Sequence, residues 1–289
     1  MMRIEDIIAG FPKRAAASHK GDYGHVLVIA GSSGYTGAAY FASQAAALSG
    51  SGLVTLAVGK SIYPVLAVKL SEVMVRPVIE TKDASPSLMA EKDIVALAER
   101  CDCLALGPGI SRNKETQTLA RNLVAKVGRQ VVLDADGINA FDAHVDALKK
   151  AKVPLILTPH PGEFGALIGK EAAAVQDNRK ELALTFANQY NTILVLKGHE
   201  TIVAHPDGRF YVNQTGNPGM AAGGVGDILT GMIASFAGQG IAPFNAAILG
   251  VYFHGLAGDL AMKEKGVLSL LATDILRKLP EAFKALDAG

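Results

Sequence analysis

Short apolar runs rich in β-branched residues alternate with longer helical patterns through the first two thirds of the chain. This order is typical of a parallel sheet covered by helices, because parallel strands are joined by crossovers of a dozen or more residues. The predicted strands are residues 26–30, 53–58, 73–78, 103–106, 131–134, 155–158 and 193–196. The predicted helices between them are residues 37–49, 91–100, 114–126, 143–149 and 177–189.

The pattern changes after Lys197, where two short apolar runs follow each other closely. These runs, residues 202–204 and 210–213, flank Pro206-Asp207-Gly208, which is typical of a hairpin turn. A hairpin joins antiparallel strands, so we expect an antiparallel edge on an otherwise parallel sheet.

The final segment, from Gly224 onward, is predicted to be helical. Pro243 is expected to open its second helix and Pro280 its last, since proline fits the first turn of a helix. No linker, internal repeat or shift of composition divides the sequence. We therefore expect residues 1–289 to form a single domain.

The charge balance argues against partners that are strongly anionic polymers or surfaces. Lys and Arg number 28 and Asp and Glu 27, which gives a net charge of +1 and no electrostatic footprint for nucleic acid or anionic lipid. The chain has 31 Gly and no Trp, which indicates tight turns and close backbone approaches rather than stacking surfaces. This composition is typical of an α/β enzyme that handles phosphates.

Three features indicate a cytoplasmic protein. Residues 1–12 lack the basic-then-apolar order of a signal peptide. The uncharged stretches 26–59 and 228–258 are interrupted by glycine clusters or by Pro243, so we expect buried elements and no membrane span. Cys101 and Cys103 are interpreted as small buried hydrophobic residues in a reducing compartment, since no further Cys or His cluster completes a metal site.

Glycine-rich clusters follow five of the predicted strands. Each alone is more typical of an ordinary turn. In an open parallel sheet, however, ligands bind beyond the carboxyl ends of the strands, so five such clusters at one edge predict a binding site. The clusters are residues 31–39, 107–109, 134–139, 158–163 and 197–201.

The most informative segment is residues 216–227, which contains Gly223, Gly224 and Gly226 and leads directly into an apolar helix. A helix start offers unpaired N–H groups and the positive end of the helix dipole, so it attracts negative charge. Asp227 is interpreted either as a capping carboxylate or as a catalytic base beside an anion hole, and the helix start is expected to depress its pKa.

The familiar phosphate-binding motifs are missing. There is no Gly-x-x-x-x-Gly-Lys-Ser/Thr loop and no protein-kinase signature. The loop after the first strand does not match Gly-x-Gly-x-x-Gly, which argues against an ordinary dehydrogenase.

Taken in order over residues 18–279, the motifs of this chain resemble the ADP- or ATP-dependent NAD(P)H-hydrate dehydratases of the ribokinase-like superfamily. The resemblance implies a three-layer α/β/α domain with a mostly parallel sheet. It also implies repair of nicotinamide cofactors, in which water is removed from the S epimer of the hydrated ring at the expense of a nucleotide, commonly ADP. The matching motifs are Lys20-Gly21-Asp22-Tyr23-Gly24, Gly31-Ser32, Tyr35-Thr36-Gly37-Ala38, Gly107-Pro108-Gly109, Asp134-Ala135-Asp136-Gly137-Ile138-Asn139, Thr158-Pro159-His160-Pro161-Gly162-Glu163, Lys197-Gly198, and Gly216-Asn217-Pro218-Gly219 through Gly226-Asp227.

The resemblance also implies roles for individual residues. The ring hydroxyl would be phosphorylated and then lost as phosphate, with Asp227 as the base and the backbone around Gly224 and Gly226 stabilising the phosphoryl group. Val225 stands where Ser or Thr is common, but the backbone N–H groups remain, so we expect the anion hole to survive. The nucleotide would be bound by Lys197, Gly198, His199, Glu200, Thr201 and Gly226, and the hydrated dinucleotide by Ala38, Gly109, His160 and Asp227.

The residues themselves leave alternative interpretations open for Lys197 and His160. Lys197 is either a phosphate ligand or a surface lysine. His160 is either a ligand contact, stiffened by its flanking prolines, or a loop histidine bonded to backbone. His254, on an apolar helix, is interpreted as a core or interface residue.

The acidic residues allow a magnesium site. Glu163 follows His160 at the spacing of the Asn-x-x-Glu element of related vitamin kinases, so it is expected to hold Mg²⁺ through water, with His160 departing from that pattern. Asp134 and Asp136 either join the same water network or, for Asp136, cap residues 137–141.

Partners follow from the same resemblance. The 19 residues before Lys20 leave no room for an epimerase domain, so a separate epimerase is expected. A homotetramer is also expected, although helix 244–262 suits a buried core as well as an interface. The alternative functions are an ATP-dependent vitamin-precursor kinase of the same superfamily and a catalytically silent nucleotide sensor.

Overall fold

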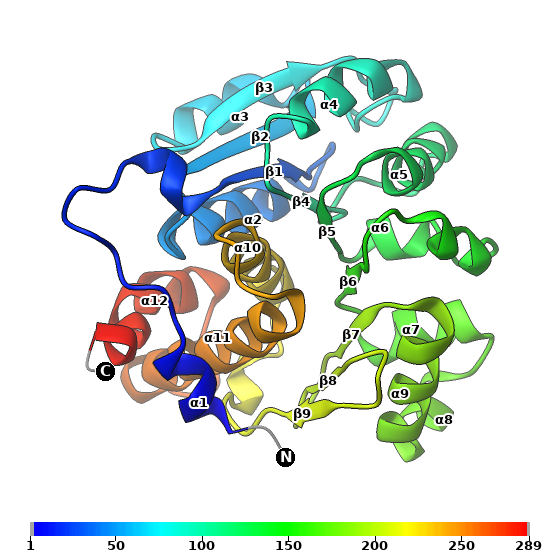
Figure 1. The fold of residues 1–289 in the computed structure, drawn as a ribbon. Coiled ribbons are helices and arrows are strands. Elements are labelled where there is room, and N and C mark those ends of the chain that lie inside the picture. The colour runs from blue at the N-terminus through cyan, green and yellow to red at the C-terminus, as the bar shows by residue number, and fades with distance from the viewer. Residues whose placement is uncertain (1–2, 288–289) are drawn as a thin grey trace.

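The computed structural model describes residues 3–287, which form one continuous nine-stranded sheet between layers of helices (Figure 1). The strand order is β3-β2-β1-β4-β5-β6-β7-β8-β9. The strands from β1 to β7 pair in parallel, and β8 and β9 pair antiparallel at the edge. Their bounds are His25–Ile29, Leu53–Gly59, Met74–Val78, Cys103–Leu106, Gln130–Leu133, Ile156–Leu157, Ile193–Leu196, Ile202–Ala204 and Phe210–Val212. The predicted parallel sheet with an antiparallel edge is confirmed.

The inner strands are buried on both faces, and their alternate residues enter two separate cores. In β1, Val26 and Val28 pack into one core and Leu27 and Ile29 into the other. Side chains on a strand point to opposite faces in turn, so a strand apolar at every position must be covered on both sides. This explains why the predicted strands are continuous apolar runs.

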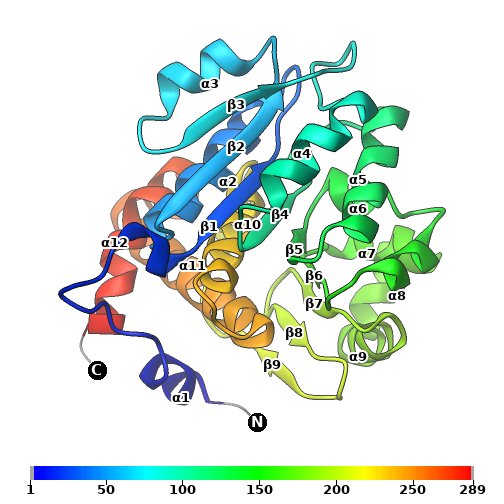
Figure 2. The same ribbon diagram turned by 45° about the horizontal axis from the view of Figure 1, so that its top comes forward.

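Helices cover each face of the sheet (Figure 2). The first layer holds α2 (Thr36–Leu48), α3 (Tyr63–Lys69), α10 (Val225–Gly238), α11 (Pro243–Lys265) and α12 (Ala272–Asp287). The second layer holds α4 (Glu91–Ala98), α5 (Lys114–Lys126), α6 (Asp136–Asn139), α7 (Pro161–Ile168), α8 (Ala172–Asp177) and α9 (Arg179–Tyr190). Helix α1 (Ile4–Ala9) packs against α11. The predicted three-layer arrangement is confirmed.

Two predicted helices differ from the structure. Residues 145–150 form a 3₁₀ helix in place of the α-helix expected at 143–149. The last helix does not begin at Pro280 but eight residues earlier, and Pro280 lies inside it. Helix α12 starts at Ala272 because Asp274 accepts a hydrogen bond from the backbone N–H of Leu271 at 3.1 Å. Burial of Leu279 on the core side holds the helix across the proline.

Helix α11 resolves one alternative left open by the sequence. Most of its residues are buried in the first core, from Phe244 through Phe253 to Ala261. Its apolar character is therefore that of a core helix. Within the described part of the chain, no helix combines the length and apolarity needed to cross a membrane.

Candidate active site

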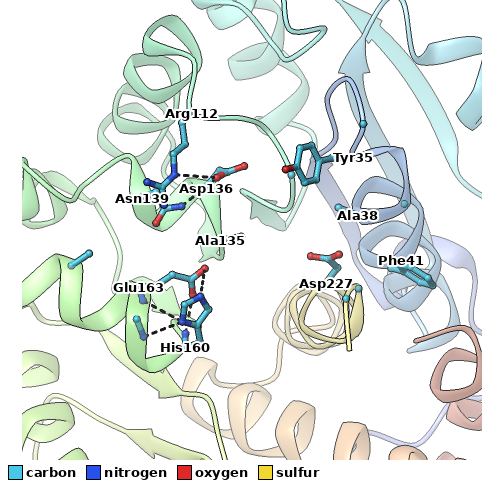
Figure 3. Close-up of a pocket in the computed structure, with 17 residues that line it drawn as sticks. Tyr35, Ala38, Phe41, Arg112, Ala135, Asp136, Asn139, His160, Glu163 and Asp227 are labelled. Carbon is cyan, nitrogen blue, oxygen red and sulfur yellow. Dashed lines mark hydrogen bonds and ion pairs between the residues drawn. The ribbon is translucent and has the colours of Figure 1, made fainter. Parts of the chain in front are cut away.

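A cavity of about 650 Å³ opens at the carboxyl ends of β1, β4, β5 and β6, beside the start of α10 (Figure 3). This volume suits a ligand of drug or nucleotide size. The predicted site residues that line it are Ala38, Gly109, His160, Glu163, Gly224 and Asp227. The first four follow parallel strands, whose topology brings them to one edge, as predicted. Gly224 and Asp227 reach the same cavity from the start of α10.

The start of α10 requires glycine and leaves backbone donors free. Gly224 precedes the helix with φ of 88°, and a Cβ atom there would lie 2.7 Å from the Phe41 ring. Within residues 3–287, the backbone N–H groups of Gly226 and Asp227 have no hydrogen-bond acceptor. Unpaired N–H groups in the first turn of a helix bind anions in general.

Val225 and His254 support this turn from behind. The Val225 side chain is buried in the first core, and its carbonyl accepts a hydrogen bond from His254 Nε2 at 2.9 Å. Burial lowers the pKa of His254 to about 4, so the ring is neutral and donates from Nε2. The interpretation of His254 as a core residue is confirmed.

Asp227 lies in the first turn of α10 and its carboxylate faces the cavity (Figure 3). The predicted depression of its pKa is wrong, because burial and the nearby Asp134 raise that pKa to about 7 and outweigh the attraction of Lys197. The capping interpretation is also wrong, since the N-cap is Gly224 and no backbone N–H of the described residues donates to this carboxylate. The side chain is left free to act on a ligand.

Lys197 is the centre of a buried charge cluster. Its Nζ donates a hydrogen bond to Asp134 Oδ1 at 2.7 Å and lies 4.0 Å from Glu163 Oε2. Asp134 is buried, and its second oxygen accepts a hydrogen bond from Thr230 Oγ1 at 2.7 Å. Burial lowers the pKa of Lys197, but the two carboxylates more than compensate and leave that pKa raised. The surface-lysine interpretation is therefore wrong.

His160 and Glu163 cap helix α7 reciprocally. His160 Nδ1 accepts hydrogen bonds from the backbone N–H groups of Gly162 and Glu163, at 3.0 and 3.3 Å. Glu163 Oε2 accepts one from the backbone N–H of His160 at 2.8 Å. The histidine is thus bonded to backbone, as one interpretation held, and its ring still borders the cavity. Burial raises the pKa of Glu163, against the opposing effect of Lys197.

Asp136 does not cap its own helix, which contradicts one of its two interpretations. The N-cap of α6 is Ala135, and the Asp136 carboxylate reaches back to the loop after β4. It accepts hydrogen bonds from Ser111 N at 3.0 Å and from Asn139 Nδ2 at 3.2 Å. Asp136 therefore fixes one loop of the cavity against another.

The predicted nucleotide segment lies beside the cavity and does not line it. Gly198, His199, Glu200 and Thr201 are absent from the described cavity wall. Arg179, which sequence reasoning missed, holds this turn by donating to the carbonyls of Leu196, Lys197 and His199. Gly226 is also absent from the described wall and lies close to Lys197, since a Cβ atom at Gly226 would lie 3.4 Å from Lys197 Nζ.

Sequence reasoning also missed four cavity residues with large or polar side chains. Tyr35 and Asn139 lie inside the motifs that were quoted, and Arg112 follows Gly109 by three residues. All three residues follow predicted strands, which is a signal of a binding site, but none of the motifs gives a role to their side chains. Phe41 lies on α2, and only its position on the helix could have predicted that it faces the cavity. The four residues are Tyr35, Phe41, Arg112 and Asn139.

Comparison with known proteins gives consistent matches. The family described as NAD(P)H-hydrate dehydratase matches residues 26–281. The bifunctional NAD(P)H-hydrate repair enzyme of Moorella thermoacetica is 44% identical over 276 residues, which is 96% of this chain and 52% of that protein. This chain thus spans about half the length of that relative. The ADP-dependent (S)-NAD(P)H-hydrate dehydratase of Bacillus subtilis is 34% identical, over 98% of this chain and 97% of that protein.

Solved structures agree with these matches. The crystal structure of the ADP/ATP-dependent NAD(P)H-hydrate dehydratase from Bacillus subtilis, co-crystallised with ATP and Mg²⁺, superposes with a TM-score of 0.85 at 33% identity. The alignment covers 98% of this chain and 97% of that chain. The hydroxyethylthiazole kinase of Pyrococcus horikoshii gives a TM-score of 0.63 at 14% identity, which shows a shared fold.

Proposed function

Because this chain belongs to the NAD(P)H-hydrate dehydratase family, as its motifs predict, we propose that it removes water from the S epimer of NAD(P)H hydrate at the expense of ADP. The observation that carries the proposal is the free Asp227 carboxylate, which faces the cavity beside unpaired backbone donors. A base and an anion hole on the same helical turn suit transfer of a phosphoryl group to a hydroxyl.

The ring hydroxyl of the hydrate is the nucleophile in this reaction. Its oxygen bonds to the β-phosphorus of ADP while the bond from that phosphorus to the oxygen of AMP breaks. Asp227 orients the hydroxyl and accepts its proton. In the second step the carbon–oxygen bond to the new phosphate breaks and the adjacent ring carbon loses a proton, which restores the double bond. The products are NAD(P)H, AMP and phosphate.

The anion hole belongs to the start of α10. The N–H groups around Gly224 and Gly226 would stabilise the migrating phosphoryl group. Lys197 borders this place, and its hydrogen bond to Asp134 fixes the ammonium where the nucleotide phosphates would meet it. We assign Gly198, His199, Glu200 and Thr201 to the rest of the nucleotide, and Ala38, Gly109 and His160 to the dinucleotide.

Magnesium fits the charge of this cluster. The carboxylates of Asp134, Glu163 and Asp227 outnumber the Lys197 ammonium, and carboxylate oxygens are the protein ligands Mg²⁺ prefers. No group of three or more His, Cys, Asp or Glu side chains within the described residues is arranged to enclose a metal. Glu163 would therefore hold the ion through water. The bound ion would neutralise phosphate charge during transfer.

The proposal also includes a partner enzyme, a cellular location and an oligomeric state. Relatives of about twice the length are named bifunctional repair enzymes, which fits an epimerase as a functional partner of this chain. Free, buried Cys101 and Cys103 fit a reducing, cytoplasmic location. A homotetramer stays a prediction, and size-exclusion chromatography with light scattering checks it.

One assay separates the proposed activity from its alternatives. Hydrated NADH is incubated with Mg²⁺ and either ADP or ATP, and the absorbance band of reduced nicotinamide is followed. Recovery of the band, faster with ADP, supports the proposal, and a clear preference for ATP removes only the nucleotide assignment. A stable phosphoester on a vitamin precursor would indicate the kinase, and nucleotide binding with no turnover would indicate the sensor.

A further inference from the structure

The charged side chains that line the cavity are mostly acidic. Asp136, Glu163 and Asp227 face it as carboxylates, and Arg112 is the permanently charged cation among the lining residues in the described part of the chain. Lys197 is not in that wall and is already paired with Asp134. A dinucleotide with two or three phosphates needs a counter-charge in such surroundings.

The guanidinium of Arg112 is available for this purpose. Its closest carboxylate contact is from Nε to Asp136 Oδ1 at 4.0 Å, which is too long for a hydrogen bond. The side chain is 67% exposed, and within residues 3–287 it donates no hydrogen bond. The Asp136 carboxylate already accepts hydrogen bonds from Ser111 and Asn139, so it does not need one from Arg112.

The backbone that carries Arg112 is held firmly on both sides. Ser111 has φ of 69°, a strained value for a residue with a side chain, and its N–H is fixed by Asp136. Asn113 donates from its backbone to Ser111 Oγ at 3.2 Å and from Nδ2 to Asp83 Oδ2 at 2.8 Å. The position of Arg112 is thus fixed while its charged end is free, an arrangement suited to ligand binding.

We propose that Arg112 binds a phosphate group of the hydrated dinucleotide, with its planar fork donating to two phosphate oxygens. Arg112 and Asp227 lie on opposite sides of the cavity, so this contact holds the end of the substrate remote from the reacting ring (Figure 3). The phosphate is either the pyrophosphate, which both hydrates carry, or the 2′-phosphate, which only NADPH hydrate carries. This inference rests on the proposed function.

The test uses Arg112→Ala, Arg112→Lys and the control Lys114→Ala, which removes an exposed charge two residues away and outside the cavity wall. Binding of each hydrate is measured by calorimetry without ADP, so no turnover is required, and KM values are then measured with ADP. Arg112→Ala should weaken hydrate binding by about 10- to 100-fold, Arg112→Lys by less, and Lys114→Ala not at all, with the KM for ADP unchanged in each.

The two hydrates distinguish the source of the phosphate. Equal losses for NADH hydrate and NADPH hydrate indicate the pyrophosphate, and a loss confined to NADPH hydrate indicates the 2′-phosphate. Unchanged affinity for both in Arg112→Ala, or a loss that appears for ADP instead, overturns the inference while wild-type turnover leaves the proposed function intact. Wild-type protein that binds and converts neither hydrate overturns both.

Discussion

The pKa of Asp227, the proposed base, is raised by burial and by a neighbouring carboxylate. An aspartate with an ordinary pKa is a weak base at neutral pH. Burial and the negative charge of Asp134 bring the pKa of Asp227 to about 7, where it accepts a proton more readily and is still substantially ionised. Lys197 limits the rise, so the hydrogen-bonded pair of Lys197 and Asp134 acts on the pKa of Asp227 in opposite directions.

Asp227→Asn should remove most of the turnover and keep the fold and ADP binding. The amide matches the carboxylate in size but cannot accept the hydroxyl proton, and general-base catalysis typically contributes about 10²–10⁴-fold. Single-turnover rates at saturating ADP and Mg²⁺, with calorimetry for ADP, measure both effects. In the wild type, kcat/KM should rise with pH through about 7. If the variant retains more than about a tenth of the rate, the base assignment is wrong.

The same substitution should change the pH dependence of stability. The folded state raises the pKa of Asp227 from 3.8 to about 7, so between these values the folded protein binds more protons than the unfolded chain. This stabilisation is complete below pH 4 and is lost as pH rises through 7. Relative to the wild type, Asp227→Asn should therefore gain on the order of 2 kcal/mol between pH 5 and pH 8. Urea unfolding at both pH values measures the difference, and equal changes at the two would contradict it.

Lys197→Met should destabilise the protein as well as weaken ADP binding. Removal of the ammonium leaves the buried Asp134 carboxylate without its ionic partner, and breaking such pairs typically costs about 3–5 kcal/mol. The double variant Asp134→Asn/Lys197→Met removes both charges and should recover much of that stability without recovering ADP affinity. Denaturant unfolding and calorimetry on both variants separate the structural role from the binding role. Full ADP affinity in the stable double variant would place Lys197 outside the nucleotide site.

At the scale of elements, the first turn of α10 depends on one glycine more than on its neighbours. Gly224→Ala introduces a Cβ at positive φ and 2.7 Å from the Phe41 ring, so it should cost about 1–3 kcal/mol. Gly223→Ala is the matched control, because no atom lies within 4 Å of its added Cβ. Thermal unfolding without ligand compares the two variants. Equal stability would show that Phe41 and the turn adjust freely.

The elements that the sequence predicts well are those whose burial is uniform. Strands such as Cys103–Leu106 and Ile193–Leu196 are continuous apolar runs between polar turns, and both were predicted to the residue. The helix Pro161–Ile168 was missed because its start is rich in proline and glycine. The reciprocal cap of His160 and Glu163 and the burial of Phe164 and Leu167 stabilise it. Pro280 was misleading because tertiary burial of Leu279 outweighs the local effect of proline.

The site was predictable as a set of loops but not as a set of contacts. Parallel topology places the residues after each parallel strand at one edge, so Gly109, His160 and Glu163 could be grouped from sequence. Asp227 follows the antiparallel strand β9, and its only sequence signal is the glycine-rich start of its helix. The bond between Lys197 and Asp134 joins residues 63 positions apart and depends on register between strands. The raised pKa of Asp227 depends on the same packing, and no local motif encodes it.

On the scale of the whole molecule, the sheet joins two hydrophobic cores, and the cavity draws on both sides of it. Strand β1 pairs with β2 and β4 and sends alternate residues into each core, so neither core can form without the sheet. The cavity is lined by α2 and α10 on one side and, on the other, by the loop before α5 and by α6 and α7 with the residues that precede them. A ligand bound there contacts segments that run from Gly34 to Asp227.

The prediction for the whole chain is therefore one cooperative unfolding transition that each ligand shifts as a unit. Calorimetry should give a single peak whose calorimetric and van't Hoff enthalpies agree, as expected if residues 1–289 form one domain. ADP, or a hydrate without ADP, at 100 times its Kd should stabilise the fold by about 2.7 kcal/mol and raise Tm by roughly 5 °C. Scans without ligand, with ADP, and with NADPH hydrate test this directly. Two peaks, of which ADP shifts only one, would divide the chain into independent units and contradict the single-domain assignment.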